Sequence, residues 1–277
     1  MVNQPDKVHV DLAGAPQTML ATLYAKALDA DAEHPVVGDT YAKDLVRQLD
    51  YDWRRTSITG RNRRAFSVTI RTAHFDTWAR QFLTVHPAAT VLHLGCGLDS
   101  RMLRLKPGPD VDWYDIDYPD VIALRKRFYP PDGQYRLVAG SVTEMGWLSA
   151  VPADRPVLLL AEGLTMFLTE RAGIALLRRV VERFPSGELQ FDAFNRLAIR
   201  LQKLNTVVRQ SGSTLHWAIN GPHDIVHAVP GVRLLSAMSV FDAETLTRAP
   251  HRYRLVGRLI SPLPPLKMML QFHRYAF

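Results

Sequence analysis

The feature that most constrains the fold of this chain is a series of short apolar segments separated by stretches long enough to form helices. The segment Val157–Ala161 contains no polar residue, which is typical of a strand buried on both faces of a sheet. Strands that alternate with helices form parallel sheets with helices on both faces. The sequence therefore predicts an α/β fold, a doubly wound domain whose five strands are Thr90–Leu94, Val111–Ile116, Tyr135–Ala139, Val157–Ala161 and Glu188–Phe194.

Segments on either side of these strands complete the predicted organisation. The chain has 277 residues, too few for two large domains at about 150 residues each. Residues 1–88 are expected to form a helical extension packed on the core. Residues 89–277 are expected to form that core, with a helical cap inserted at about 195–230. Two β-like runs near the C-terminus, Val232–Val240 and Lys267–Phe277, would add a final hairpin and bring the mostly parallel sheet to seven strands.

Periodic apolar residues indicate where the helices lie. Thr169 is expected to be the N-cap of a helix between the fourth and fifth strands. A helix over about residues 62–86 would place one apolar stripe against the protein, formed by Phe75, Trp78, Phe82 and Val85. The first half of the cap would be a helix with the stripe Leu197, Leu201, Leu204 and Val208.

Composition narrows the class of protein. Lys and Arg number 34 against 27 Asp and Glu, but this net charge of +7 is dispersed, so a nucleic-acid partner is not expected. The single Cys96 can form neither an internal disulfide nor a cysteine-based zinc site, which favours a reducing cytoplasm and no metal. No apolar run approaches the roughly 20 residues that cross a bilayer, so no membrane partner is expected. The oligomeric state is left open.

A glycine-rich turn follows the first predicted strand and opens a helix. Its sequence is Leu94-Gly95-Cys96-Gly97-Leu98-Asp99-Ser100-Arg101. Doubly wound sheets bind nucleotide-like ligands at such turns, because glycine lets the backbone approach the ligand closely. A dinucleotide fingerprint would have Gly or Ala at the position of Ser100, so the sequence argues against a dehydrogenase.

Two carboxylates end the second predicted strand. Asp115 and Asp117 lie on one face of an extended segment, about twenty residues beyond the glycines. From this position a carboxylate can accept both hydroxyls of a ribose. One acid could instead cap the helix begun by Pro119, and Asp117 is favoured for the ribose.

Arg71 and Glu162 are further candidates. Arg71 shares a helix stripe with Phe75 and so points toward the protein, where a guanidinium needs an anion. That anion could be Asp76, Asp99, a helix C-terminus or the carboxylate of a ligand. Glu162 follows the fourth strand, where a cleft is expected to open.

Together these motifs resemble the leucine carboxyl methyltransferase family of class I S-adenosylmethionine enzymes, and within it the branch of the tetracenomycin polyketide carboxyl methyltransferase. The resemblance runs from about Thr18 to Asn195 and less specifically to the C-terminus. It is carried by Tyr24–Leu28, Arg71-Thr72, Phe75-Asp76, Leu94–Arg101, Tyr114–Pro119, Gly140–Val142, Ala161–Leu164 and Met166-Phe167.

The resemblance implies a Rossmann-like methyltransferase fold and S-adenosylmethionine as cofactor. Arg71 would hold its methionine carboxylate, Glu162 would face its amino group, and Asp117 would bind its ribose. Ser141 stands where the protein-methylating members of the family have Asp, which argues against a protein substrate. The implied cofactor-binding residues are Lys26, Arg71, Gly95, Gly97, Asp99, Asp117, Ser141, Val142 and Glu162.

The predicted reaction is methyl-ester formation on a small acidic metabolite of polyketide or peptide origin. A carboxylate is already ionised at neutral pH, so positioning replaces a catalytic base. A phenol or alcohol acceptor would need a base, for which His216 or His223 could serve. A binding protein without turnover is a third reading. Substrate contacts are expected from Trp53, Arg54, Asn195, Arg196, His216 and Trp217.

Overall fold

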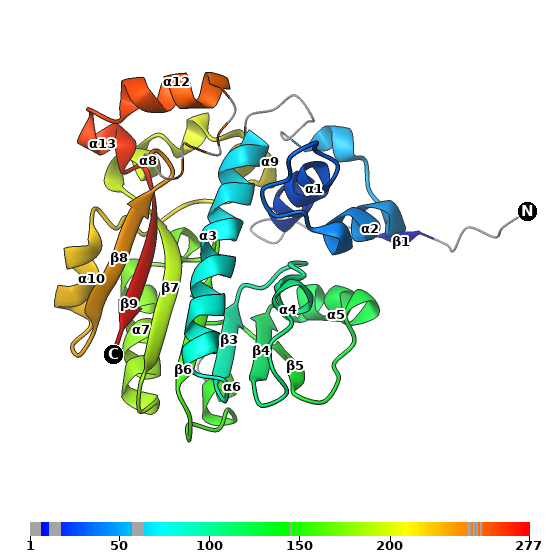
Figure 1. Ribbon diagram of the computed structural model, residues 1–277, viewed down its shortest axis with the longest axis vertical. Helices are drawn as coiled ribbons and strands as arrows, with labels where there is room; N and C mark the ends of the chain where they lie inside the picture. The colour runs from blue at the N-terminus through cyan, green and yellow to red at the C-terminus, as the bar shows by residue number, and fades with distance from the viewer. Residues whose placement is uncertain are drawn as a thin grey trace, which may run out of the picture.

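A seven-stranded sheet forms the centre of the molecule. The computed structural model describes residues 7–10, 18–56, 64–144, 146–242, 245, 247, 249 and 251–277. The sheet order is β5-β4-β3-β6-β7-β9-β8, in which the first five strands are mutually parallel and β9 runs antiparallel to both of its neighbours, β7 and β8 (Figure 1). The strands are β3 Thr90–Leu94, β4 Asp112–Asp117, β5 Tyr135–Ala139, β6 Val157–Ala161, β7 Gly187–Phe194, β8 Arg233–Ser239 and β9 Leu270–Ala276.

The predicted strands are confirmed, and all five of the parallel ones lie within about one residue of the expected bounds. Strand order reverses between β3 and β6, because β4 and β5 extend the sheet on one side and β7 on the other. Such a reversal opens a crevice at the carboxyl ends of the strands. The antiparallel β9 and β8 form the added pair at one edge.

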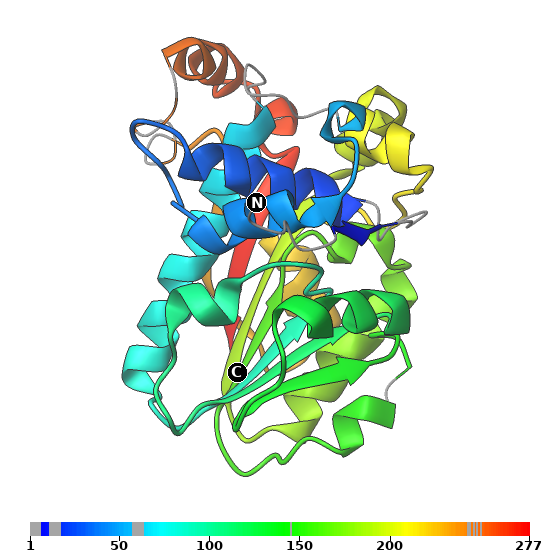
Figure 2. The ribbon, with the colours of Figure 1, turned by 90° about the vertical axis from the view of Figure 1, so that its right-hand side faces the viewer.

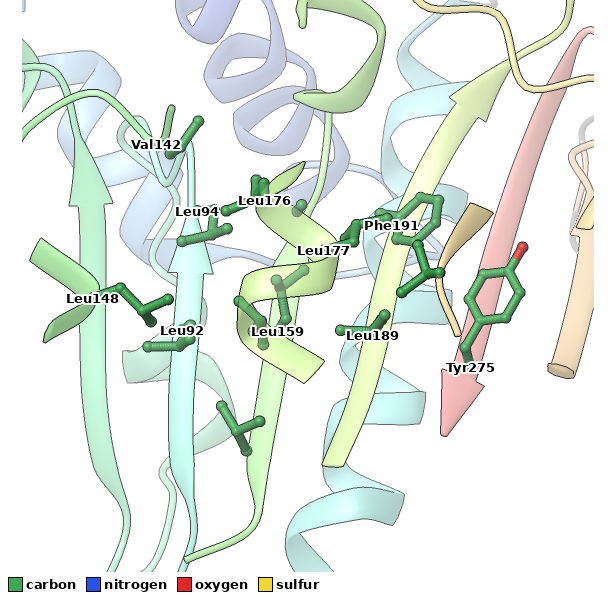
Figure 3. Close-up of a cluster of buried hydrophobic side chains, with 14 of the residues drawn as sticks. Leu92, Leu94, Val142, Leu148, Leu159, Leu176, Leu177, Leu189, Phe191 and Tyr275 are labelled. Atoms are coloured by element: carbon green, nitrogen blue, oxygen red, sulfur yellow. The ribbon is translucent and has the colours of Figure 1, made fainter. Parts of the chain in front are cut away.

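One face of the sheet carries an apolar core beneath three helices. These are α6 Gly146–Ser149, α7 Glu170–Arg183 and α10 Pro222–Ala228. Leucines of β3, β6 and β7 meet Leu176 and Leu177 of α7 there (Figure 3). Thr169 caps α7 as predicted, since its hydroxyl accepts a hydrogen bond from the amide of Ala172 at 3.3 Å.

The opposite face is covered by α3 Arg64–Val85 and by two short helices from the core, α4 Arg101–Leu105 and α5 Pro119–Phe128. The other N-terminal helices, α1 Thr18–Ala30 and α2 Thr40–Gln48, join the same apolar cluster from the carboxyl ends of the strands (Figure 2). Phe75, Trp78 and Phe82 of α3 are buried as predicted. The assignment of Val85 to this stripe is wrong, because Val85 ends the helix and is 72% exposed.

The cap is broken into short helices where one was predicted. They are α8 Arg196–Arg200, the 3-10 turn η4 Gln202–Leu204 and α9 Thr206–Ser211. Asn205 starts a new helix because its side chain accepts from the amides of Val207 and Val208. The expected stripe is therefore split, with Val208 buried and both Leu201 and Leu204 exposed.

The remaining elements lie around this framework. Val8–His9 (β1) pairs in parallel with Leu49–Asp50 (β2), and Trp53–Arg55 forms the 3-10 turn η2. Thr165–Phe167 forms the turn η3 after β6, while α12 His251–Ile260 and α13 Pro264–Lys267 precede β9. Within the described ranges, no helix combines the length and the apolar character needed to cross a membrane.

Candidate functional site: a crevice and a cavity at the carboxyl ends of the strands

A crevice of about 110 Å³, hereafter the crevice, lies where the strand order reverses. It is formed by the segments that follow β3, β4, β5 and β6, together with the start of α1. Figure 2 shows α1 and α2 lying across these strand ends. Its lining residues are Thr18, Met19, Gly95, Gly97, Asp117, Tyr118, Val121, Gly140, Val142, Gly163, Leu164, Phe167 and Leu168.

The glycine turn has a backbone that other residues would strain. Gly95 and Gly97 have φ values of 61° and 51°, in the left-handed region. A Cβ on Gly95 would come within 3.2 Å of Leu164, and one on Gly97 within 3.1 Å of Met19. Both glycines are therefore needed for the tight floor of the crevice.

Asp117 faces the crevice and Asp115 does not. The Gly97 amide donates to Asp117 Oδ2 at 2.7 Å, and the Tyr118 amide donates to Oδ1 at 2.8 Å. Burial raises the pKa of Asp117, although these two hydrogen bonds oppose the shift. A carboxylate offers about four acceptor positions, so capacity remains for ligand hydroxyls.

Asp115 is instead the centre of a buried hydrogen-bond cluster. It accepts from the indole of Trp113 at 2.9 Å and from Nε of Arg125 at 2.8 Å. His93 Nδ1 and the hydroxyl of Tyr135 both lie 2.7 Å from its oxygens. Burial would raise the pKa of Asp115, but the attraction of Arg125 and the bonds from His93 and Tyr135 outweigh it, so the pKa is lowered. Neither Asp115 nor Asp117 caps α5, which begins without a side-chain cap.

Arg71 binds two carboxylates from neighbouring strands. Its Nε donates to Glu162 Oε1 at 3.0 Å and its Nη1 to Asp192 Oδ2 at 2.7 Å. Glu162 also accepts from the hydroxyl of Thr72 at 2.8 Å. Nη2 of Arg71 has no hydrogen-bond partner among the described residues, and it lies 3.6 Å from the place of a Cβ on Gly163. Two of the partners considered from the sequence, Asp76 and Asp99, are not bonded to Arg71, and the ligand carboxylate stays a prediction.

A buried ion network continues from Glu162 to the start of α4. Arg101 binds Glu162 and, at 2.8 Å, Asp76. Asp99 accepts from Lys26 at 3.0 Å and from Arg104 at 2.6 Å. Burial would raise the pKa of Asp99 and of Glu162, but the neighbouring cations outweigh it and lower both. The network joins the cations Lys26, Arg71, Arg101 and Arg104 to the carboxylates Asp39, Asp76, Asp99, Glu162 and Asp192.

A larger cavity of about 590 Å³, hereafter the cavity, adjoins the crevice. Thr18, Gly163 and Phe167 line both spaces, so the two meet at these residues. The cavity is walled by α1, α3, the cap, α12 and the segment before β9. Arg71 is the one charged residue among its described lining residues, most of which are apolar, including Val68, Met166, Phe194, Val208, Leu215, Phe241 and Leu270.

The structure places the remaining predicted cofactor residues as follows. Val142 lines the crevice directly, and Ser141 lies beside it with its hydroxyl bonded to Thr143 at 2.8 Å. Lys26, Asp99 and Glu162 belong to the buried network behind the crevice wall.

The six predicted substrate contacts occupy other positions, since none is among the described residues lining the crevice or the cavity. Trp53 stacks on Tyr24, and the exposed Arg54 pairs with Asp52. Asn195 caps α8 by accepting from Ala198, and its amide group donates to the carbonyl of Pro265. Arg196 and His216 are exposed. Trp217 is buried against Gly173, where an added Cβ would fall 2.0 Å from the indole ring.

Sequence reasoning missed Asp192 and Arg101. Asp192 accepts hydrogen bonds from Arg71 and, at 2.6 Å, from the amide of Gly163. The second hydrogen bond holds the segment after β6 in place. The available signal was a carboxylate inside a strand predicted to be buried, since such a group needs a partner. Arg101 lies within the glycine motif, but its fully buried position depends on α3.

The sheet order, the glycine turn after β3 and the carboxylate at the end of β4 are typical of doubly wound proteins that bind a nucleoside cofactor. The structure is similar to that of a putative methyltransferase from Thermobifida fusca, with a TM-score of 0.55, 15% identity, and coverage of 91% of this chain and 93% of that one. A DUF574 family protein from Streptomyces avermitilis has a TM-score of 0.53 at 12% identity, over 91% and 96% of the two chains. At these identities the similarity concerns the fold alone.

Residues 18–181 match the family model described as leucine carboxyl methyltransferase, and the chain belongs to this family. The tetracenomycin polyketide synthesis O-methyltransferase TcmP of Streptomyces glaucescens is 41% identical over 268 residues, 97% of this chain and 98% of that protein. The S-adenosyl-L-methionine-dependent methyltransferase dpfgK of Gibberella zeae is 37% identical over 254 residues, 85% of each chain. The protein is an S-adenosylmethionine-dependent methyltransferase of the TcmP type, as predicted.

Proposed function

We propose that the protein methylates the carboxylate of an apolar small molecule and forms a methyl ester. The observation that carries this proposal is the chemistry of the cavity wall. Among its described lining residues there is no His, Asp or Glu, and the one charged side chain is the cation Arg71. Burial raises the pKa of Tyr253, which also lines the cavity, so its phenol is not a base at neutral pH.

This wall suits an acceptor that arrives already ionised. A carboxylate has a pKa near 4 and needs no base, whereas a phenol has a pKa near 10 and does. His216 and His223, the bases considered for a phenol, are not among the described lining residues of the cavity. Glu162 and Asp192 lie close by, but both are bonded to Arg71.

The crevice fits the cofactor of the family. Asp117 has acceptor capacity for the ribose hydroxyls, and the left-handed Gly95 and Gly97 leave room for a ligand above them. The free Nη2 of Arg71 suits a carboxylate, while five network carboxylates against four cations leave one negative charge for an ammonium group. When bound, S-adenosylmethionine supplies an electrophilic methyl group on its sulfonium sulfur.

The residues shared by the two spaces would control the transfer. Thr18, Gly163 and Phe167 border the only place where a donor in the crevice and an acceptor in the cavity could meet among the described residues. The apolar wall excludes water around the acceptor oxygen, which strips a carboxylate of solvation and favours its attack. Catalysis then depends on the relative placement of the two substrates.

The acceptor class follows from the size and the polarity of the cavity. A volume of about 590 Å³ accommodates a multi-ring acid better than a short aliphatic one. TcmP is named for tetracenomycin polyketide synthesis, and its similarity over nearly the whole chain supports a polyketide-like acid as acceptor.

The test is to incubate the protein with S-adenosylmethionine and a panel of polycyclic aromatic acids, matched phenols and acetate. We expect mass spectrometry to detect methylated polycyclic acids, and mild alkali to destroy these products. The Asp117→Ala variant should abolish turnover at a limiting donor concentration. An alkali-stable product formed from the phenols would contradict the ester proposal.

A further inference from the structure

The end of the molecule around the cavity combines exposed leucines with unpaired cations. The cap (α8, η4 and α9) and the α12–α13 segment both lie at this end, to which the parallel strands point (Figures 1 and 2). Six apolar side chains here are between 38% and 73% exposed, and they are Leu201, Leu204, Leu255, Val256, Leu259 and Leu263. We name these six residues, with the cations given next, the apical surface.

The cations of the apical surface have no carboxylate partner among the described residues. They are the exposed side chains of Arg196, Arg200, Lys203, Arg209, Arg254 and Arg258. The sequence explains this, because residues 193–223 and 245–277 contain no Asp or Glu. The network around Arg71 shows the opposite arrangement, in which every cation is paired.

In α12 the two kinds of side chain form adjacent stripes. Leu255 and Leu259 are four residues apart, as are Arg254 and Arg258, so each pair lies on one face of the helix. The other face of α12 points inward, since Tyr253 and Ile260 line the cavity. Apolar residues beside basic ones on an exposed helix face are typical of segments that lie in a membrane interface.

We infer that the apical surface docks on an anionic lipid bilayer, with the leucines inserted among the acyl chains and the arginines against lipid phosphates. A second copy of the chain does not fit, because the same cations would face each other. Leu255, Leu259 and Leu263 are exposed and line neither the crevice nor the cavity, so they suit a deformable surface better than the helix of an acidic protein. Docking would place the mouth of the cavity, rimmed by Leu201 and Leu204, against the phase into which an apolar acid partitions.

This inference concerns docking on the bilayer and not spanning it. The sequence-based expectation of no membrane partner depends only on the lack of a membrane-spanning segment. A helix that lies in the membrane interface does not need such a segment. It is also independent of the acceptor proposed above.

The test is co-sedimentation of the whole protein with vesicles, read without any activity. We expect binding to vesicles of mixed phosphatidylglycerol and phosphatidylcholine, weakened by salt, and little binding to phosphatidylcholine alone. The Arg254→Glu/Arg258→Glu and Leu255→Ser/Leu259→Ser variants should each weaken binding by about tenfold or more.

Matched controls lie outside the apical surface. Val85→Ser removes an equally exposed apolar side chain, and Lys126→Glu/Arg127→Glu reverses two exposed charges in the last turn of α5. Both controls should bind vesicles like the unaltered protein. Thermal unfolding checks that every variant folds. If an α12 variant does not fold, Lys203→Glu/Leu204→Ser tests the part of the apical surface formed by the cap.

Two results would overturn the inference. The first is that the unaltered protein stays in solution with anionic vesicles at low salt. This result is also the one expected if the apical surface binds an acidic protein and not a bilayer. The second is an equal loss of vesicle binding in the control and apical variants.

Discussion

The crevice and the cavity lie side by side and are built on opposite principles. The wall behind the crevice is a network of buried ion pairs, with Arg101 fully buried and bonded to Asp76 and Glu162. The cavity is about five times larger, at about 590 Å³ against 110 Å³, and has one charged lining residue among those described. If the cofactor binds in the crevice and the acceptor in the cavity, as proposed, fixed charges recognise the first, and space and apolar surface recognise the second.

The strongest test of this contrast is Arg101→Ala. The change removes one cation from each of two buried carboxylates, so that Asp76 keeps only Arg104 and Glu162 keeps only Arg71. Breaking a buried pair costs about 3–5 kcal/mol of unfolding free energy. Chemical denaturation measures the loss. Arg136→Ala is the control, because Arg136 pairs with Asp112 at the surface and such pairs contribute about 0–1 kcal/mol. Equal losses in the two variants would show that the network does not stabilise the fold.

The second test separates the two carboxylates of β4. Asp117→Ala removes an acceptor at the crevice and should weaken cofactor binding by about 1.5–3 kcal/mol, the range for hydrogen bonds to charged groups. Asp115→Ala should lower the unfolding free energy instead, because it leaves the buried Arg125 without a carboxylate partner. Isothermal titration calorimetry and denaturation distinguish these outcomes. Equal losses of cofactor affinity in two folded variants would contradict this assignment.

The third test uses acid. The pKa values of Asp99, Asp115 and Glu162 are lowered in the folded protein by neighbouring cations. At pH values between the folded and the ordinary pKa, the unfolded chain binds more protons than the folded protein. These carboxylates therefore stabilise the fold above about pH 4, and this contribution is lost as the pH falls through their folded pKa values. We expect the melting temperature to decrease as the pH is lowered below about 4. The decrease should be smaller in Asp115→Asn, measured relative to the same variant at pH 7. A melting temperature independent of pH would contradict the ionised network.

The smallest effect is expected at the rim of the cavity. Leu204→Ala should change the unfolding free energy by no more than about 0.5 kcal/mol, because Leu204 is 73% exposed. It should raise the KM for the acceptor a few-fold and leave cofactor affinity unchanged, since Leu204 lines the cavity and not the crevice. Steady-state kinetics with both substrates measure this. A change in the KM for the cofactor would show that the two spaces are not independent.

The local sequence determined the framework of the crevice. Apolar runs and turn residues act over a few positions, so they fixed the strands, the glycine turn, the Thr169 cap and the place of Asp117. Helix breaks inside the cap were harder to predict, because Asn205 competes with a continuous apolar stripe.

Only the tertiary structure decided which charges pair and where the large apolar cavity forms. Arg71 binds Glu162 and Asp192, which are 91 and 121 residues away in the chain, and no local period encodes such contacts. The cavity likewise is enclosed by side chains from α1, α3, the cap and α12, so the contribution of each residue depends on how distant segments pack. Local propensity sets the elements, whereas burial and charge pairing arise only when those elements meet.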